Sequence, residues 1–125
     1  MSYQSFEELE VWKIACQISI ELYSELKDCK DYSFRDQMQR ASVSIASNIA
    51  EGSERNSNKE FIRFLYIAKG SAAELKTQLY IAHKVGIISL EKRNEFSDKL
   101  LSVSKMLHSL IKSILSKPNT LNPTP

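Results

Sequence analysis

Hydrophobic residues recur along most of the chain at alternating steps of four and three, a spacing that places them on one side of an α-helix. The stripe nearest the C-terminus comprises Phe96, Leu100, Val103, Leu107, Leu110 and Ile114. The stripe before it comprises Phe61, Leu65, Ala68, Ala72, Leu75, Leu79 and Ala82. Each pattern predicts a long amphipathic helix with one buried side.

Two further stripes lie in the first half of the chain. They comprise Leu9, Trp12, Cys16, Ser19, Tyr23 and Leu26, and then Met38, Ala41, Ile45, Ile49 and Gly52. Together the four stripes predict helices over about residues 6–29, 34–52, 58–85 and 90–116.

The expected helix ends carry residues that favour them. Ser33, Ser57 and Ser89 precede three of the stripes, and serine is a common N-cap residue because its hydroxyl accepts a free backbone amide. Ser57 followed by Glu60 has the spacing of a capping box. Gly86 can adopt the left-handed conformation that ends a helix.

Four helices with short connections and one apolar side each predict an all-α fold. We expect an antiparallel up-down-up-down four-helix bundle that fills a single domain over residues 1–116. Residues 117–125 end in PNTLNPTP, which has three prolines and no hydrophobic period. A flexible, disordered tail is therefore expected there.

Three of the expected helices carry more apolar surface than one bundle needs, which is an arc of roughly 100°. Scattered exposed apolar residues are normal on proteins, but organised second strips usually mark contacts. The strips therefore favour a homo-oligomer. The predicted interface residues are Val11, Ile18, Leu22, Val43, Ala50, Ile62 and Tyr80.

Small and polar residues gather where the second and third helices would meet. A glycine inside a helix costs about 1 kcal/mol relative to alanine, so a mid-helix glycine suggests close approach of another backbone. Close packing is predicted at Gly52, Gly70 and Ser71. A structural polar network that fixes the register of the helices is predicted at Arg40, Asn48, Glu51, Glu60 and Glu74.

Basic residues and a tyrosine also lie at and after the expected turn between the second and third helices. Basic groups interleaved with aromatic rings suit single-stranded nucleic acid, which binds through its phosphates and its bases. The predicted contact residues are Arg55, Lys59, Arg63, Lys69 and Tyr66. Because Glu51, Glu54 and Glu60 stand among them, ion pairing within the bundle is the alternative interpretation.

Composition narrows the function classes. The chain has 125 residues, a net charge of +2 and two cysteines, which is typical of one soluble domain in the reducing cytoplasm. No apolar run is long enough to span a bilayer. His83 and His108 lack a ligand partner one helical turn away, and no phosphate loop or nucleophile elbow occurs. We therefore expect no metal, no cofactor, no small-molecule substrate and no enzymatic activity, unless an unrecognised carboxylate site exists.

Two long runs resemble a known family. They are RASVSIASNIAEGSER at 40–55 and KEFIRFLYIAKGSAAEL at 59–75, supported by FEELEVWK at 6–13 and VGII at 85–88. The sequence is similar to the bacterial four-helix-bundle proteins encoded by intervening sequences in 23S rRNA genes. It departs from them at Ala46, where proline is frequent, and at Lys76, where an acid is common.

The resemblance implies a left-handed bundle that assembles as a homopentamer, and it implies no enzyme. A related branch, the accessory variability proteins of diversity-generating retroelements, binds nucleic acid and a reverse transcriptase. We therefore expect an oligomeric accessory protein that binds RNA or DNA. The alternative is a scaffold for protein–protein interaction without nucleic-acid binding, and the sequence leaves the partner and the biological role open.

Overall fold

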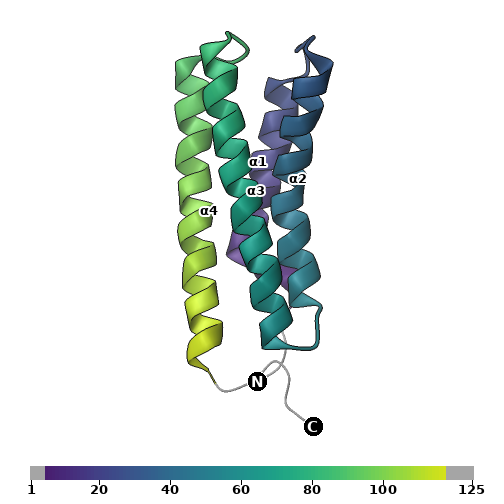
Figure 1. The fold of residues 1–125 in the computed structure, drawn as a ribbon, viewed down its shortest axis with the longest axis vertical. Helices are drawn as coiled ribbons and strands as arrows, with labels where there is room; N and C mark the ends of the chain where they lie inside the picture. The colour runs from purple at the N-terminus through teal and green to yellow at the C-terminus, as the bar shows by residue number, and fades with distance from the viewer. Residues whose placement is uncertain (1–4, 118–125) are drawn as a thin grey trace.

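The structure, a computed structural model, describes residues 5–117, and these form four α-helices after a short 3-10 helix (Figure 1). The elements are η1 (Phe6–Glu8), α1 (Glu10–Glu25), α2 (Tyr32–Ser53), α3 (Asn58–Lys84) and α4 (Leu90–Ser116). The predicted all-α fold class is confirmed. The predicted tail lies, apart from Lys117, outside the described residues.

Side-chain caps fix the starts of α3 and α4. The Ser57 Oγ accepts a hydrogen bond from the Glu60 amide at 3.1 Å, and the Ser89 Oγ accepts one from the Lys92 amide at 3.1 Å. Each bond satisfies one of the amides that a helix start leaves without a partner. Gly86 follows the end of α3 with a φ of +86°, which favours glycine.

The first two helices begin differently from the prediction. A 3-10 turn precedes α1, so the helix itself begins at Glu10 rather than near Phe6. The cap of α2 is Asp31, whose Oδ1 accepts a hydrogen bond from the backbone amide three residues later at 3.2 Å. Ser33, the predicted cap, lies inside the helix because Asp31 already provides the acceptor one turn earlier.

Each helix packs on its neighbours in sequence, and α1 packs on α4 to close the bundle. Figure 1 shows the connections alternating between the two ends, with α1–α2 and α3–α4 joined at one end and α2–α3 at the other. Consecutive helices therefore run in opposite directions. The handedness of the bundle stays a prediction.

The core side of α1 is not the predicted one. Its buried apolar residues are Val11, Ala15, Ile18 and Leu22, none more than 4% exposed, and they step by four, three and four. Ser19, a member of the predicted stripe, is buried beside them. Trp12 and Cys16 are only half-buried and Tyr23 is exposed. The apolar arc of α1 is wide enough to contain two stripes, and the aliphatic stripe lies in the bundle core.

The two predicted close-packing glycines have different surroundings. A Cβ added to Gly52 would lie 2.6 Å from the Phe64 Cβ and 3.2 Å from the Phe61 carbonyl oxygen. Gly52 therefore lets the end of α2 approach α3 closely. At Gly70 an added Cβ would meet nothing within 4 Å, so the expectation of close packing at Gly70 is wrong for contacts within this chain.

Candidate functional site

A small polar relay joins α2 to α3. The Asn48 Nδ2 donates hydrogen bonds to the backbone oxygen and the Oγ of Ser44, at 2.8 and 3.0 Å. The Ser44 Oγ lies 2.9 Å from the Oγ of Ser71, which is buried in α3. Because buried polar groups are costly without partners, these bonds favour one register between the two helices.

A second relay, which the sequence interpretation missed, joins α1 to α2. The Ser19 Oγ lies 2.8 Å from the Oγ of Ser42, and Ser42 is fully buried. The Ser42 hydroxyl also donates to the Gln39 backbone oxygen at 2.8 Å. A serine inside an apolar stripe gives no sign in the sequence that it has a hydrogen-bond partner. Only the packing of α1 on α2 shows that Ser19 and Ser42 are partners.

The remaining members of the predicted polar network do not connect helices. Glu51 pairs with Arg55 and Glu60 pairs with Arg63. Among residues 5–117, Glu74 accepts only from Gln78, one turn away on α3. These contacts are local along the chain. The sequence predicts ion pairs between α2 and α3. The structure instead joins these helices by the hydrogen bonds of Asn48, Ser44 and Ser71.

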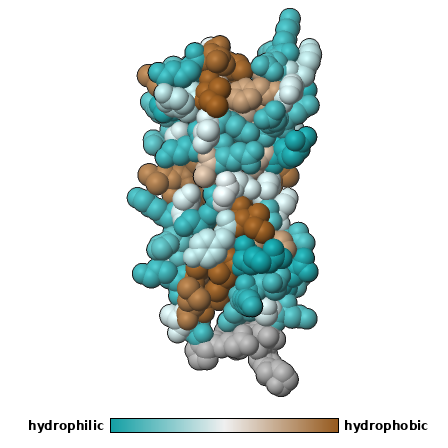
Figure 2. All heavy atoms as spheres, in the orientation of Figure 1, coloured by the Kyte–Doolittle hydropathy of each residue, from teal (hydrophilic) through white to brown (hydrophobic). Residues whose placement is uncertain are grey.

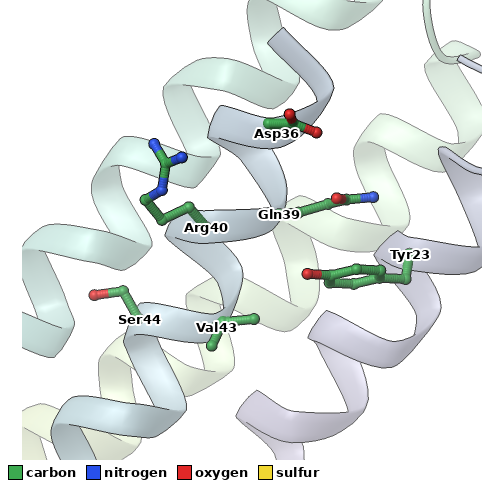
Figure 3. Close-up of a pocket in the computed structure, with 6 residues that line it drawn as sticks. All are labelled: Tyr23, Asp36, Gln39, Arg40, Val43 and Ser44. Atoms are coloured by element: carbon green, nitrogen blue, oxygen red, sulfur yellow. The ribbon is translucent and has the colours of Figure 1, made fainter. Parts of the chain in front are cut away.

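Arg40 instead lines an open hollow of about 460 Å³ on the outer side of α2. Figure 3 shows the Tyr23 ring extending from α1 toward α2, with Arg40 and Ser44 on the far flank of that helix. The other lining residues are Asp36, Gln39 and Val43. The hollow is open, and its lining mixes polar and apolar side chains.

Two arginines of the predicted nucleic-acid surface meet at the α2–α3 turn. The guanidinium carbons of Arg55 and Arg63 lie 4.9 and 4.6 Å from the centre of the Phe64 ring. Arg55 Nη2 lies 2.7 Å from a Glu51 carboxylate oxygen, and Arg63 Nη2 lies 3.0 Å from a Glu60 oxygen. We call Arg55, Lys59 and Arg63 the turn cluster.

The pKa shifts agree with this pairing. The hydrogen bond from Arg63 lowers the pKa of Glu60, and the charges of Arg63, Arg55 and Lys59 lower it further. The same hydrogen bond raises the pKa of Arg63. The Glu60 carboxylate beside the turn cluster therefore stays ionised and offsets part of the cluster's positive charge.

A second group of cations and aromatic rings lies at the other end of α3, and the sequence interpretation missed it. The Lys84 Nζ lies 5.5 Å from the centre of the Tyr80 ring, and the Arg93 guanidinium carbon of α4 lies 5.4 Å from it. About two turns along α3 from Arg63, the Lys69 Nζ lies 5.8 Å from the centre of the Tyr66 ring. The sequence does not predict Arg93 as a member of this group, because Arg93 lies on α4 and its contact with Tyr80 of α3 depends on how the two helices pack.

A mostly apolar groove lies between α1 and α2. We call it the α1/α2 groove. It is lined by seven apolar residues and two serines: Phe6, Trp12, Cys16, Ser19, Ile20, Val43, Ala46, Ser47 and Ala50. Its volume is about 460 Å³, and η1 contributes Phe6, whose ring meets Trp12 edge-on at 5.2 Å. Burial raises the pKa of the Cys16 thiol, so this lining group stays neutral.

The structure corrects the predicted oligomer interface. Val11, Ile18 and Leu22 lie inside the bundle, with 4%, 0% and 0% of their surface exposed, so they cannot contact another copy. Val43 and Ala50 do line the α1/α2 groove. The other two expected interface residues lie on α3, where Ile62 is half-buried against the core and Tyr80 is exposed beside two cations.

No helix among residues 5–117 is both long and apolar enough to cross a membrane. Within the same range, no cluster of three or more histidine, cysteine, aspartate or glutamate side chains is arranged to hold a metal ion.

Comparison with known proteins identifies the family. Among solved structures, a protein of unknown function from the S23 ribosomal protein family of Bacteroides thetaiotaomicron has a similar fold, with a TM-score of 0.77 and 25% sequence identity. The alignment covers 82% of this chain and 98% of that one. No curated protein matches the chain. Residues 7–109 match the family model of the 23S rRNA-intervening sequence proteins, and the chain belongs to this family.

Proposed function

We propose that this chain is a non-enzymatic cytoplasmic protein that assembles with copies of itself through the α1/α2 groove. The observation that carries the proposal is the mostly apolar lining of this groove. Ile20 is 62% exposed and Val43 is 42% exposed, on helices that already bury a complete core stripe. The two free cysteines suit a reducing compartment.

The energetics favour covering the groove. Burying apolar surface is worth about 25 cal/mol per Å², and large contiguous apolar patches are rare on monomers. Aromatic side chains such as Trp12 and Phe6 are typical anchors of interfaces. The resemblance to the family implies that five copies assemble.

Light scattering after gel filtration tests the assembly. We expect a mass of about 72 kDa, five times the 14.3 kDa chain. The variant Ile20→Lys places a charge in the groove and should shift the mass toward 14.3 kDa. Leu115→Lys is the matched control, since Leu115 is similarly exposed at 66% but lies outside the groove. A wild-type monomer, or equal effects of both variants, would refute the proposed assembly.

We further propose that the assembled protein acts as an accessory factor that binds RNA or DNA. Support comes from exposed tyrosines that carry cations on their rings, at Tyr66 and at Tyr80. Such pairs offer charge for phosphates and a ring for bases. The alternative is a protein-binding scaffold.

Fluorescence anisotropy with a labelled single strand distinguishes the two functions. An accessory factor should bind the strand at 50 mM salt and release it as salt increases, because phosphate contacts release counterions. A scaffold should show no binding to RNA, to single-stranded DNA or to duplex at the same salt.

A further inference from the structure

One side of the bundle, where α3 and α4 meet, carries basic and uncharged polar residues at helical spacing. On α3, Lys69, Lys76, Tyr80 and His83 follow in steps of seven, four and three, which places them on one face. On α4, Arg93, Ser97, Ser104 and His108 follow in steps of four, seven and four. No aspartate or glutamate stands at any of these positions.

The contact between Tyr80 and Arg93 shows that the two faces adjoin. Arg93 extends from α4 to the Tyr80 ring of α3, and Lys84 meets the same ring from the next turn of α3. Lys69 lies three turns from Tyr80 on the same face, where it meets the Tyr66 ring. We call the surface formed by Lys69, Lys76, Tyr80, Lys84 and Arg93 the α3/α4 seam.

The four cations of the α3/α4 seam are Lys69, Lys76, Lys84 and Arg93. In the described part of the chain, they differ from those of the turn cluster in having no carboxylate that neutralises their charge. Within residues 5–117, none of the four forms an ion pair with a carboxylate; Arg93 donates only to the neutral side-chain oxygen of Asn94, at 3.2 Å. In the turn cluster, two of three cations are paired with Glu51 and Glu60. Figure 2 looks onto this side of the molecule, where hydrophilic side chains predominate and separate hydrophobic patches lie between them.

We propose that the α3/α4 seam binds the phosphate backbone of a single-stranded nucleic acid. The proposal rests on the proposed nucleic-acid binding and assigns it to a surface other than the turn cluster. From Lys69 to Lys84 the seam is about 22 Å long, at 1.5 Å per residue. That length matches about six nucleotides of a stacked strand, which rises 3.4 Å per phosphate.

A single strand fits the seam better than a duplex does. Tyr66 is 55% exposed and Tyr80 is 49% exposed, so each ring has free surface for an unpaired base. Base–aromatic stacking tolerates any sequence because every base has a π face. The cations beside the rings can pair with the phosphates of the nucleotide whose base stacks on the ring.

The number of cations fixes the expected salt dependence. Four phosphate contacts on a single strand give a slope of about −2.8 for the logarithm of affinity against the logarithm of salt concentration. Between 50 and 200 mM salt the affinity should therefore fall about 50-fold.

Two double variants that remove the same charge test the assignment. Lys76→Gln with Arg93→Gln removes two cations of the α3/α4 seam, and Arg55→Gln with Arg63→Gln removes two from the turn cluster. The probe is a fluorescein-labelled oligo(U) strand of 20 nucleotides, followed by anisotropy from 50 to 200 mM salt. Circular dichroism melting confirms that both proteins remain folded.

The seam variant should make the salt dependence less steep, with a slope of about −1.4 in place of −2.8. It should also weaken binding at 50 mM salt by about 60-fold. The turn variant should leave the slope near −2.8. A third variant, Tyr80→Leu, should weaken strand binding at least about fivefold while leaving the slope unchanged, because it removes stacking and no charge.

The outcomes separate the location from the function. Equal losses in the two double variants, or a loss in the turn variant alone, would overturn the seam while nucleic-acid binding stands. Absence of binding by the wild-type chain would overturn both. Duplex RNA that binds as tightly as oligo(U), with no effect of Tyr80→Leu, would overturn the single-strand assignment.

Discussion

The opposite surroundings of Gly52 and Gly70 predict opposite effects of the same substitution. In Gly52→Ala the new methyl group would lie 2.6 Å from the Phe64 Cβ and 3.2 Å from the Phe61 carbonyl oxygen. Neither atom is the free end of a flexible side chain, so α2 has to move away from α3. Overpacking of this kind costs about 1–3 kcal/mol.

Alanine also favours the helix over glycine by up to about 1 kcal/mol, which offsets part of that cost. Gly52 lies in the last turn of α2, where the helix benefit is smaller than at a central position. The net expectation for Gly52→Ala is a loss of about 1–2 kcal/mol of unfolding free energy.

Gly70→Ala is the matched control. Gly70 lies in the middle of α3, is exposed, and has no atom within 4 Å of the added Cβ. Only the helix benefit remains, so the variant should gain up to about 1 kcal/mol. In thermal terms, each kcal/mol corresponds to about 4 °C for a domain of this size.

Urea unfolding at one fixed protein concentration measures both differences, since an oligomer's stability depends on concentration. The physical reasoning fails if Gly52→Ala is as stable as the wild type. It also fails if Gly70→Ala is destabilised, which would place the backbone of another molecule against that face of α3.

Two further predictions concern a helix cap and an ion pair. Asp31→Ala should cost about 1 kcal/mol because it removes the acceptor that caps α2, whereas Ser33→Ala should change stability by less than about 0.5 kcal/mol; urea midpoints compare them. The ion pair with Lys99 lowers the pKa of Glu21, so its stabilisation is present above the ordinary carboxyl pKa and is lost as pH falls through the folded pKa. The difference in unfolding free energy between wild type and Glu21→Gln should therefore be larger at pH 7 than at pH 3, and an equal difference at both would contradict the pairing.

Local rules were sufficient for α3 and α4. Their apolar residues lie in one arc with polar residues elsewhere, so the spacing identifies the buried side, although in α4 Ile111 is more buried than the predicted Leu110. The caps at Ser57 and Ser89 depend only on a hydroxyl and a backbone amide three residues away. Such features need no knowledge of the partner helix.

The sequence was insufficient for α1, because periodicity defines an apolar arc and does not choose its centre. Two stripes were available, and the aromatic one was expected inside. In the structure the aliphatic Val11 and Ile18 are buried, while Trp12 and Tyr23 lie toward the flank. Tyrosine and tryptophan carry a polar group that favours a half-exposed position. The surplus apolar surface was recognised, but it was placed on the wrong side of α1.

The charged surfaces show the same limit. Arg55 and Arg63 were found because they are close in sequence, yet their pairing with Glu51 and Glu60 depends on side-chain geometry that spacing does not determine. Arg93 was missed because its contact with Tyr80 crosses from α4 to α3. Local ion pairs compensate Arg55 and Arg63, whereas the position of Arg93 beside Tyr80 depends on the packing of α4 on α3.

The two proposed surfaces are compatible because they use different pairs of helices. Since α1 packs on α2 and α4, and α3 packs on the same two helices, the α1/α2 groove and the α3/α4 seam lie on opposite sides of the bundle. A ring of five copies has heterologous contacts, so the groove of one copy is covered by a different surface of the next copy, and the proposal requires that this surface is not the seam. Each added copy brings another seam to the same strand, and linked sites raise the effective concentration of the next contact. A net charge of only +2 per chain then suffices, because four uncompensated cations are gathered on one side and repeated by assembly.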